Sequence, residues 1–215
     1  MTNPFDQFES LLEGPLRRLE PLEQEIFCSR LALFWEDIER PLRLLYGERP
    51  DYETWRDHFL AIVARSYAQR SSELRMLDLQ RLAEEDWFQQ PQMAGYVCYT
   101  ERFAGDLRGV EDRIDYLKEL GVTYQQLMPL LKTPPVANDG GYAVMDYRQV
   151  RDDLGTMQDL AGLAKSLRAN DISLCIDLVC NHTAKEHEWA LKAMAGDKDY
   201  QDYYVMFADR TLPDQ

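Results

Sequence analysis

The chain has 215 residues, of which 45% are apolar and 11% aromatic, and 24 Lys and Arg against 38 Asp and Glu give a net charge of −14. This composition can bury a core and excludes global disorder, and no stretch approaches the ~20 apolar residues that span a bilayer. The surplus of carboxylates repels phosphate backbones and anionic lipid, so we expect no nucleic-acid partner and no membrane partner. A neutral partner fits this charge better. The length allows one large domain or two small ones.

The chain carries no sign of export. Residues 1–9 have neither a basic start nor an apolar run, so we expect no secretory signal and a cytoplasmic protein. The four cysteines are Cys28, Cys98, Cys175 and Cys180. Residues 175 and 180 would face opposite sides of a strand, so we expect free thiols in a reducing compartment.

The first 92 residues carry helical patterns only. The first apolar stripe has three- and four-residue spacing and comprises Leu31, Phe34, Trp35, Ile38, Leu42 and Leu45. Pro41 lies inside it and predicts a break or a kink. Asp51 is a plausible N-cap for the next helix. The apolar face expected for that helix comprises Trp55, Phe59, Ile62, Val63 and Tyr67. A third helix carries Leu74, Leu77 and Leu82.

The pattern changes near Pro91 to alternating strands and helices. The segments 96–100, 122–130 and 172–179 are rich in β-formers and apolar residues, and helical spacing separates them. Gly121 closes the first of these helices, and Thr156 is a good N-cap for the second. This order predicts parallel βα units, which can begin either a doubly wound sheet or a (β/α)₈ barrel.

Two segments place polar residues where such strands end, the edge at which parallel α/β folds gather reactive groups. The first is the loop Asn138-Asp-Gly-Gly-Tyr142, whose glycines allow a sharp turn that presents Asp139 and Tyr142 together. A plain surface turn is the alternative. The second ends the third strand with Asp177, Asn181 and His182.

Asp177 lies within an apolar run, where an unpaired charge is costly, so it requires a hydrogen-bonding or charged partner or a polar cavity. A structural role is the alternative for His182. His182 and His187 are five residues apart, which does not suit a zinc pair. No G-x-G-x-x-G turn follows the first strand, so a nucleotide site is not favoured.

The pattern D-x-x-x-N-H at Asp177, Asn181 and His182, together with the D-G-G-Y loop, resembles glycoside hydrolase family 13, the α-amylase family. The stretches 98–109, 126–130, 139–144, 154–156 and 181–189 resemble the amylosucrases of that family, sucrose-dependent glucosyltransferases that also begin with an all-helical domain. The resemblance is loose over the whole chain and dense over residues 93–215. It implies an all-α domain at 1–92, the first three or so βα units of an incomplete (β/α)₈ barrel at 93–196, and the start of an inserted domain at 197–215.

The resemblance also implies residue roles. Tyr142 would stack against a glucosyl ring, His182 would bind its hydroxymethyl group, and Asp139 would pair with an arginine that this chain does not contain. Asp177 and Asn181 would support the site. Amylosucrases need no calcium, so the resemblance implies no metal at Asn181 and no cofactor, with sucrose and α-glucan as substrates.

The family uses a retaining mechanism with two carboxylates, one as nucleophile and one as acid and base. These residues come from later barrel strands, and no acid here matches their motifs, Glu186 and Glu188 included. We therefore expect the N-terminal part of an amylosucrase-like enzyme that is inactive alone. Part of a related α-glucosidase or sucrose hydrolase, and a non-catalytic helical interaction module, remain the alternatives.

Overall fold

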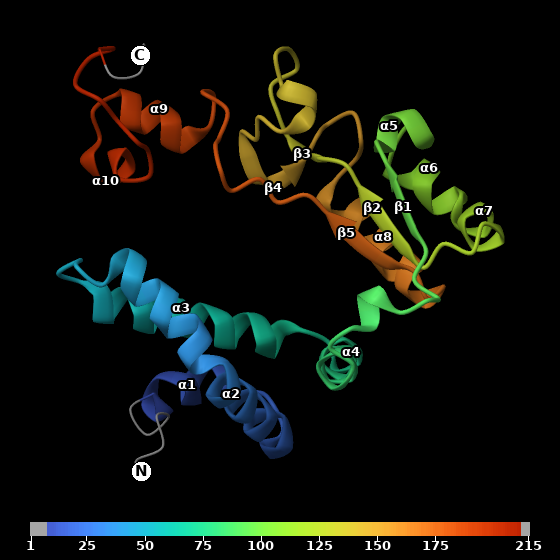
Figure 1. Ribbon diagram of the computed structural model, residues 1–215, viewed down its shortest axis with the longest axis horizontal. Coiled ribbons are helices and arrows are strands. Elements are labelled where there is room, and N and C mark those ends of the chain that lie inside the picture. Colours follow the sequence, from blue (N-terminus) through green and yellow to red (C-terminus); the bar gives the residue numbers. More distant parts are fainter. Residues whose placement is uncertain (1–7, 212–215) are drawn as a thin grey trace. The chain divides into compact units, whose positions relative to one another are not determined.

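The computed structural model describes residues 8–211, and the chain divides into two compact units that meet between Glu85 and Asp86 (Figure 1). The expected domain boundaries after residues 92 and 196 stay predictions. Residues 1–7 and 212–215 lie outside the described part. Residues 1–7 make up most of the segment for which we expect no secretory signal.

The first unit consists of helices. They are α1 (Glu9–Leu16), α2 (Pro21–Tyr46), α3 (Tyr52–Gln69) and α4 (Ser72–Ala83). A capping box between Glu20 and Glu23 begins α2, with Pro21 at its first position, where the missing N–H costs nothing. The Ser71 hydroxyl caps α4 by accepting from the Leu74 N–H at 3.3 Å.

A break or a kink was expected at Pro41; α2 continues through this residue to Tyr46, so the helix is not broken there, and the kink stays a prediction. An interior proline removes one backbone hydrogen bond and costs about 3 kcal/mol. The rest of the 26-residue helix keeps its capping box and its buried contacts at Phe27 and Leu31, and these outweigh one lost bond.

The face expected for α3 is only partly correct. The buried residues of α3 are Tyr52, Leu60, Ala61, Ala64 and Tyr67. Of the expected face, Tyr67 is buried and Val63 packs half-buried against the same core. Trp55 and Phe59 instead stack on each other at 6.0 Å, and Ile62 is 45% exposed. Asp51 occupies the N-cap position, but its carboxylate binds the Arg49 guanidinium and makes no cap hydrogen bond.

Small residues of α3 let α1 approach closely. Ala64 and Leu60 are fully buried against Leu12 and Leu16 of α1, in a core that also holds Phe27 of α2. Tyr67 of α3 belongs to this core, whereas Trp55 and Phe59 are not among its members.

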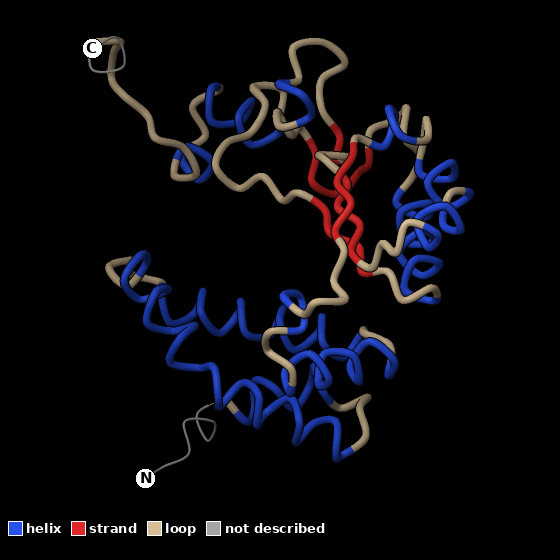
Figure 2. The backbone as a smooth tube through the Cα atoms, turned by 45° about the vertical axis from the view of Figure 1, so that its right-hand side comes forward, coloured by secondary structure: helices blue, strands red, loops and turns tan. Residues whose placement is uncertain are grey.

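The second unit contains a parallel sheet and a small antiparallel sheet. Its elements are the 3₁₀ turn η1 (Trp87–Gln89), β1 (Gly95–Cys98), α5 (Thr100–Phe103), α6 (Leu107–Asp112), α7 (Ile114–Glu119), β2 (Tyr124–Leu127), β3 (Leu131–Lys132), η2 (Asp139–Gly141), β4 (Asp146–Val150), α8 (Met157–Ala169), β5 (Ser173–Ile176), α9 (Glu188–Met194) and α10 (Lys198–Gln201). Strands β1, β2 and β5 pair in parallel in that order, as the alternating pattern predicts (Figure 2).

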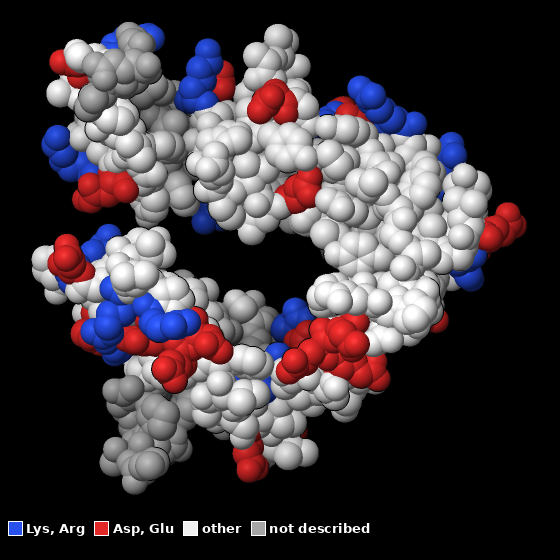
Figure 3. All heavy atoms as spheres, viewed as in Figure 1, with Lys and Arg blue, Asp and Glu red and all other residues white. Residues whose placement is uncertain are grey.

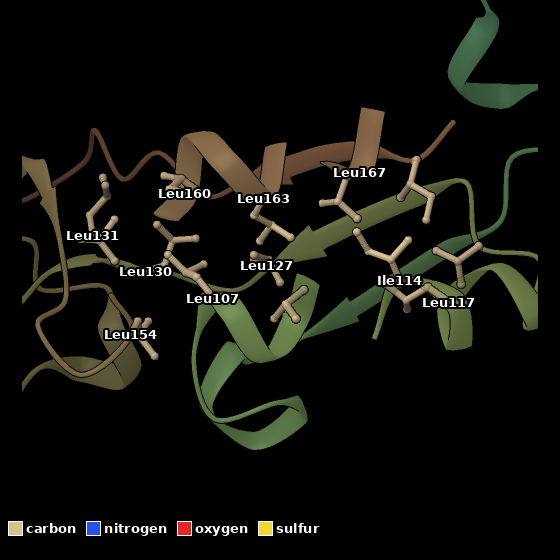
Figure 4. Close-up of a cluster of buried hydrophobic side chains, with 14 of the residues drawn as sticks. Leu107, Ile114, Leu117, Leu127, Leu130, Leu131, Leu154, Leu160, Leu163 and Leu167 are labelled. Carbon is tan, nitrogen blue, oxygen red and sulfur yellow. The ribbon is translucent and has the colours of Figure 1, made fainter. Parts of the chain in front are cut away.

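Leucines of the helices cover one face of the parallel sheet. Leu107 of α6, Leu117 of α7 and Leu163 of α8 are fully buried together with Leu127 of β2 (Figure 4). Strand residues alternate between two faces, so Val97 belongs to the opposite face, and its side chain is 59% exposed. The sheet is therefore covered on one side within the described residues.

Two features of this unit differ from the expectation. The single helix expected before Gly121 is divided at Arg113 into α6 and α7. The residues on either side of the loop 138–142 form an antiparallel pair, β3–β4, that was not expected, with Leu131 opposite Val150. The expected N-cap of α8 is confirmed, because the Thr156 hydroxyl accepts from the Asp159 N–H in a capping box.

The surface of the described helices is charged and mixed. Figure 3 shows acidic and basic side chains next to each other on the visible face. Within α2 Arg43 pairs with Glu39, and within α3 Arg56 pairs with Asp57. None of the described helices has the length and apolar character needed to cross a membrane.

Candidate functional site

The candidate site lies where the three parallel strands end. The register places Cys98, Leu127 and Ile176 in one row, each the last residue of its strand. Asp177 follows directly after β5, so it lies at the carboxyl edge of the sheet and not inside the strand. This is the edge at which parallel α/β folds bind ligands.

The carboxylate of half-buried Asp177 accepts a hydrogen bond on each oxygen. The Gln126 side-chain amide donates to Oδ1 at 3.0 Å, and the Tyr142 hydroxyl donates to Oδ2 at 3.2 Å. These two neutral donors supply the partners that the sequence requires of Asp177. They leave the negative charge in place and hold the side chain in one orientation.

The D-G-G-Y loop brings Tyr142 to this edge through two glycines with left-handed backbone. Gly140 and Gly141 have φ values of 65° and 95°. A Cβ on Gly141 would lie 3.0 Å from the Pro129 carbonyl oxygen, and one on Gly140 would lie 3.3 Å from the Tyr99 hydroxyl. The loop therefore closes tightly against the segments that follow β2 and β1.

The environment of Tyr142 keeps its hydroxyl protonated. Burial raises the pKa of the Tyr142 phenol, and the hydrogen bond to the Asp177 carboxylate raises that pKa further. The charge of nearby Asp139 acts in the same direction. At neutral pH the phenol therefore remains a hydrogen-bond donor to Asp177.

The structure does not bring all five expected residues into contact. Tyr142 and Asp177 are hydrogen-bonded, whereas Asp139, Asn181 and His182 are exposed. The His182 ring nitrogen Nδ1 lies 3.2 Å from the Asn181 side-chain amide. Among the hydrogen bonds of the described residues, none joins the His182 ring to Tyr142 or to Asp177.

Tyr147 of β4 anchors the segment that carries Asn181 and His182. Its hydroxyl donates to the Val179 carbonyl oxygen at 2.5 Å and lies 3.4 Å from the His182 carbonyl oxygen. The Ala184 N–H donates to the Val144 carbonyl oxygen at 2.8 Å. The loop after β5 is therefore held against the β3–β4 region.

His187 is a buried structural residue at the end of this loop. Its Nδ1 accepts from the Trp189 N–H at 3.1 Å and so caps α9, and its ring lies between those of Tyr147 and Trp189. Burial lowers the pKa of the His187 imidazole, which favours the neutral form that can accept this hydrogen bond. Within residues 8–211, no group of three or more His, Cys, Asp or Glu side chains is placed to hold a metal ion.

Sequence reasoning missed Gln126, Tyr99 and Tyr147 as residues of this region. Gln126 pairs in register with Cys175, two residues before Asp177, so its side chain points to the same face as Asp177. Tyr99 directly follows β1, as Asp177 follows β5. Position after a strand end was therefore a usable signal for Tyr99, whereas Gln126 needed the strand register.

Helices on one face of a parallel sheet, with a tyrosine and a carboxylate joined at its carboxyl edge, define an α/β protein of the βα-barrel type. Residues 64–214 match the family model described as "Alpha amylase, catalytic domain". The chain belongs to the α-amylase family, and its second unit is part of a TIM-barrel fold.

The curated relatives are α-glucoside enzymes. The chain is similar to an oligo-1,6-glucosidase from Parageobacillus thermoglucosidasius, with 42% identity over 102 residues, 47% of this chain and 18% of that protein. It is also 38% identical to a palatinase from Erwinia rhapontici over 102 residues, with the same coverage. The chain thus spans about a fifth of the length of these relatives.

The chain also superposes on part of several solved enzyme structures. An isomaltulose synthase from Klebsiella sp. LX3 superposes with a TM-score of 0.52 and 30% identity, covering 58% of this chain and 23% of that protein. A trehalose-6-phosphate hydrolase from Bacillus licheniformis superposes with a TM-score of 0.50 and 31% identity over 55% of this chain and 22% of that protein.

Proposed function

We propose that this chain is part of a retaining enzyme that acts on α-glucosides, and that the carboxyl-edge site binds the glucosyl ring. The observation that carries the proposal is the hydrogen-bonded set Gln126–Asp177–Tyr142 at the ends of β2 and β5. It occurs in a chain of the α-amylase family, and the charge of exposed Asp139 lies near enough to act on Tyr142.

In this proposal Tyr142 supplies a flat apolar surface for the pyranose ring. Its hydroxyl is held by Asp177, which restricts rotation of the aromatic ring and reduces the ordering cost of binding. His182 and Asn181 are exposed, so they are free to bind sugar hydroxyls, and Asp139 is free to pair with a cation outside these residues.

The catalytic carboxylates are proposed to come from sequence beyond these 215 residues. Retaining glycosidases need two carboxyl groups ≈ 5–5.5 Å apart on opposite sides of the scissile bond. The Asp177 carboxylate is engaged by Gln126 and Tyr142, which suits support of the site and not nucleophilic attack. We therefore expect the chain alone to be inactive.

The substrate class is proposed to be small α-glucosides, handled by hydrolysis or isomerisation. The supporting observation is that the similar proteins are named as oligo-1,6-glucosidase, palatinase and isomaltulose synthase. This corresponds to the α-glucosidase or sucrose-hydrolase alternative stated above.

A second candidate is an amylosucrase-like transfer of glucosyl from sucrose to an α-glucan. The observation that favours it is the helical first unit, with α1 to α4, because amylosucrases resemble this chain in beginning with an all-helical domain. The sequence stretches between residues 98 and 189 that resemble amylosucrases support the same candidate.

Product analysis with the protein encoded by the complete gene separates these candidates. Sucrose feeding should release free glucose with fructose for a hydrolase, a rearranged disaccharide for an isomerase, and a growing glucan for a transferase. If none of sucrose, isomaltose and maltose is consumed, the proposed activity is wrong.

Two variants of Tyr142 and one matched control variant test the site within that experiment. Tyr142→Ala should reduce kcat/KM about tenfold to a hundredfold, about 1.4–2.8 kcal/mol of transition-state binding, and Tyr142→Phe should reduce it less. Tyr116→Ala removes an exposed tyrosine of α7 and should leave kcat/KM unchanged. Equal kcat/KM values for Tyr142→Ala and the parent protein would show that Tyr142 does not bind the substrate.

A further inference from the structure

The first unit contains a cavity of about 380 Å³ between α2 and α3. Its apolar lining includes buried Phe27, Leu31 and Tyr67. The less buried Phe34, Ile38 and Val63 also line it. This volume lies within the ≈ 300–1,000 Å³ typical of small-molecule sites. The cavity is formed by residues 27–78 alone, so it belongs to the helical unit and not to the sheet.

The cavity also contains one cation without a partner. Arg70 and Asp78 line it as an ion pair, with Nη2 and Oδ1 2.9 Å apart. Arg30 lines it too, and its Nε is buried and has no hydrogen-bond partner. Within the part of the chain that the structure describes, Arg30 forms no ion pair.

The groups around the cavity leave the charge of Arg30 uncompensated. Beside Tyr67, the Arg75 guanidinium lies over the aromatic ring and is paired with Glu23 at 2.6 Å. Burial raises the pKa of the Tyr67 phenol, so this hydroxyl remains neutral and does not balance a cation. The local excess of one positive charge is opposite in sign to the −14 of the whole chain.

A buried N–H group without a partner destabilises the folded state, and an anion that accepts from it recovers this cost. A carboxylate matches the guanidinium in shape and charge, and the aliphatic and aromatic walls require an apolar body. We propose that this cavity binds an amphiphilic monoanion, an alkyl or aryl group that carries one carboxylate. A neutral sugar lacks the charge, and a polyanion would find only one unpaired cation.

Isothermal titration calorimetry on the 215-residue protein tests the proposal with decanoate and its neutral counterpart 1-decanol, both below their aggregation limits. Decanoate should bind at least tenfold more tightly than decanol, and high salt should reduce this advantage because it screens the Arg30 charge. Equal affinities for the two compounds, or no measurable binding of decanoate, would overturn the proposal.

Arg30→Met tests the residue and keeps a long apolar side chain. It should abolish the preference for decanoate over decanol, whereas Arg65→Met, at an exposed position of α3, should retain it. An unchanged preference in Arg30→Met would contradict the assignment. The decanoate and decanol comparison on the unmodified protein decides the proposal even if Arg30→Met does not fold.

Discussion

At the scale of single residues, the central feature is a carboxylate held by two neutral donors. The sequence indicated Asp177, because a charge within an apolar run requires a partner, and Tyr142, because it lies in a glycine-containing loop; their binding roles stay predictions. It did not identify Gln126, because one polar residue inside a strand has no visible partner until the register is known. The exposed positions of Asp139, Asn181 and His182 likewise depend on loop paths that composition does not encode.

The phenol of Tyr142 should titrate above the ordinary tyrosine value near 10. Since its folded pKa is raised, its contribution to stability is present below that value and is lost as the pH rises through the folded pKa. Asp177→Asn should lower the Tyr142 pKa but not restore it fully, because burial is the larger cause. NMR of ¹³C-labelled tyrosine measures the Tyr142 pKa, and Tyr142→Phe assigns its signal. An unchanged Tyr142 pKa in Asp177→Asn would contradict the hydrogen bond between Tyr142 and Asp177.

Tyr147→Phe should release the segment that follows β5. It removes only the hydroxyl that donates to Val179, so we expect a loss of about 1 kcal/mol in unfolding free energy and faster amide exchange over residues 177–184. Tyr116→Phe is the matched control, an exposed tyrosine whose ring remains in place. Unchanged exchange in Tyr147→Phe would show that the hydroxyl does not hold this loop.

At the scale of elements, local capping chemistry was predictable and tertiary effects were not. Thr156 begins α8 as expected, because its capping box depends on residues within one turn. Pro41 lies inside α2 and does not end it, and beyond it Tyr46 still packs against Trp55 of α3, with ring centroids 5.1 Å apart. The pair β3–β4 was missed because a two-residue strand gives no periodic signal, and its pairing joins residues far apart in the loop.

The start of α8 should be sensitive to acid. The pKa of the Asp159 carboxyl is lowered to about 2, first by the Thr156 hydroxyl and then by Arg108. A depressed pKa contributes stability above the unfolded value near 3.9, and this stability is lost as the pH falls through 2. Asp159→Asn should therefore flatten the acid limb of a stability–pH curve, whereas Asp112→Asn, at an exposed site, should not.

The contribution of the α9 N-cap to folding stability should depend on pH in a higher range than that of the α8 start. The pKa of buried His187 is lowered from 6.5, so the folded state is favoured where the imidazole is neutral and weakens as the pH falls below 6.5. His187→Asn keeps an N-cap acceptor without a titrating group, and it should reduce this pH dependence in thermal unfolding. A steeper dependence in the variant would contradict the role of His187.

At the scale of the molecule, the alternation of strands and helices predicted the parallel sheet, and several motifs together predicted the α-amylase family. The amylosucrase assignment is finer than these features support, because the similar proteins include an oligo-1,6-glucosidase, a palatinase and an isomaltulose synthase. The sheet has three parallel strands and one face with exposed Val97, whereas a complete (β/α)₈ barrel has eight strands.

The 215-residue protein alone should not cleave sucrose. Retention requires two carboxyl groups in catalytic roles, and the Asp177 carboxylate is already held by Gln126 and Tyr142. Release of glucose and fructose is the measurement, with the complete gene product as the positive control. Turnover by the 215 residues alone would contradict this expectation.

The most direct test of the glucosyl site is an NMR titration of the labelled 215-residue protein with methyl α-D-glucopyranoside. We predict weak binding, roughly millimolar, with shift changes centred on the Gln126 side-chain amide, Tyr142 and Asp177, since only part of a pocket is present. Shift changes confined to the helical unit, or none at these three residues up to saturating sugar, would contradict the account.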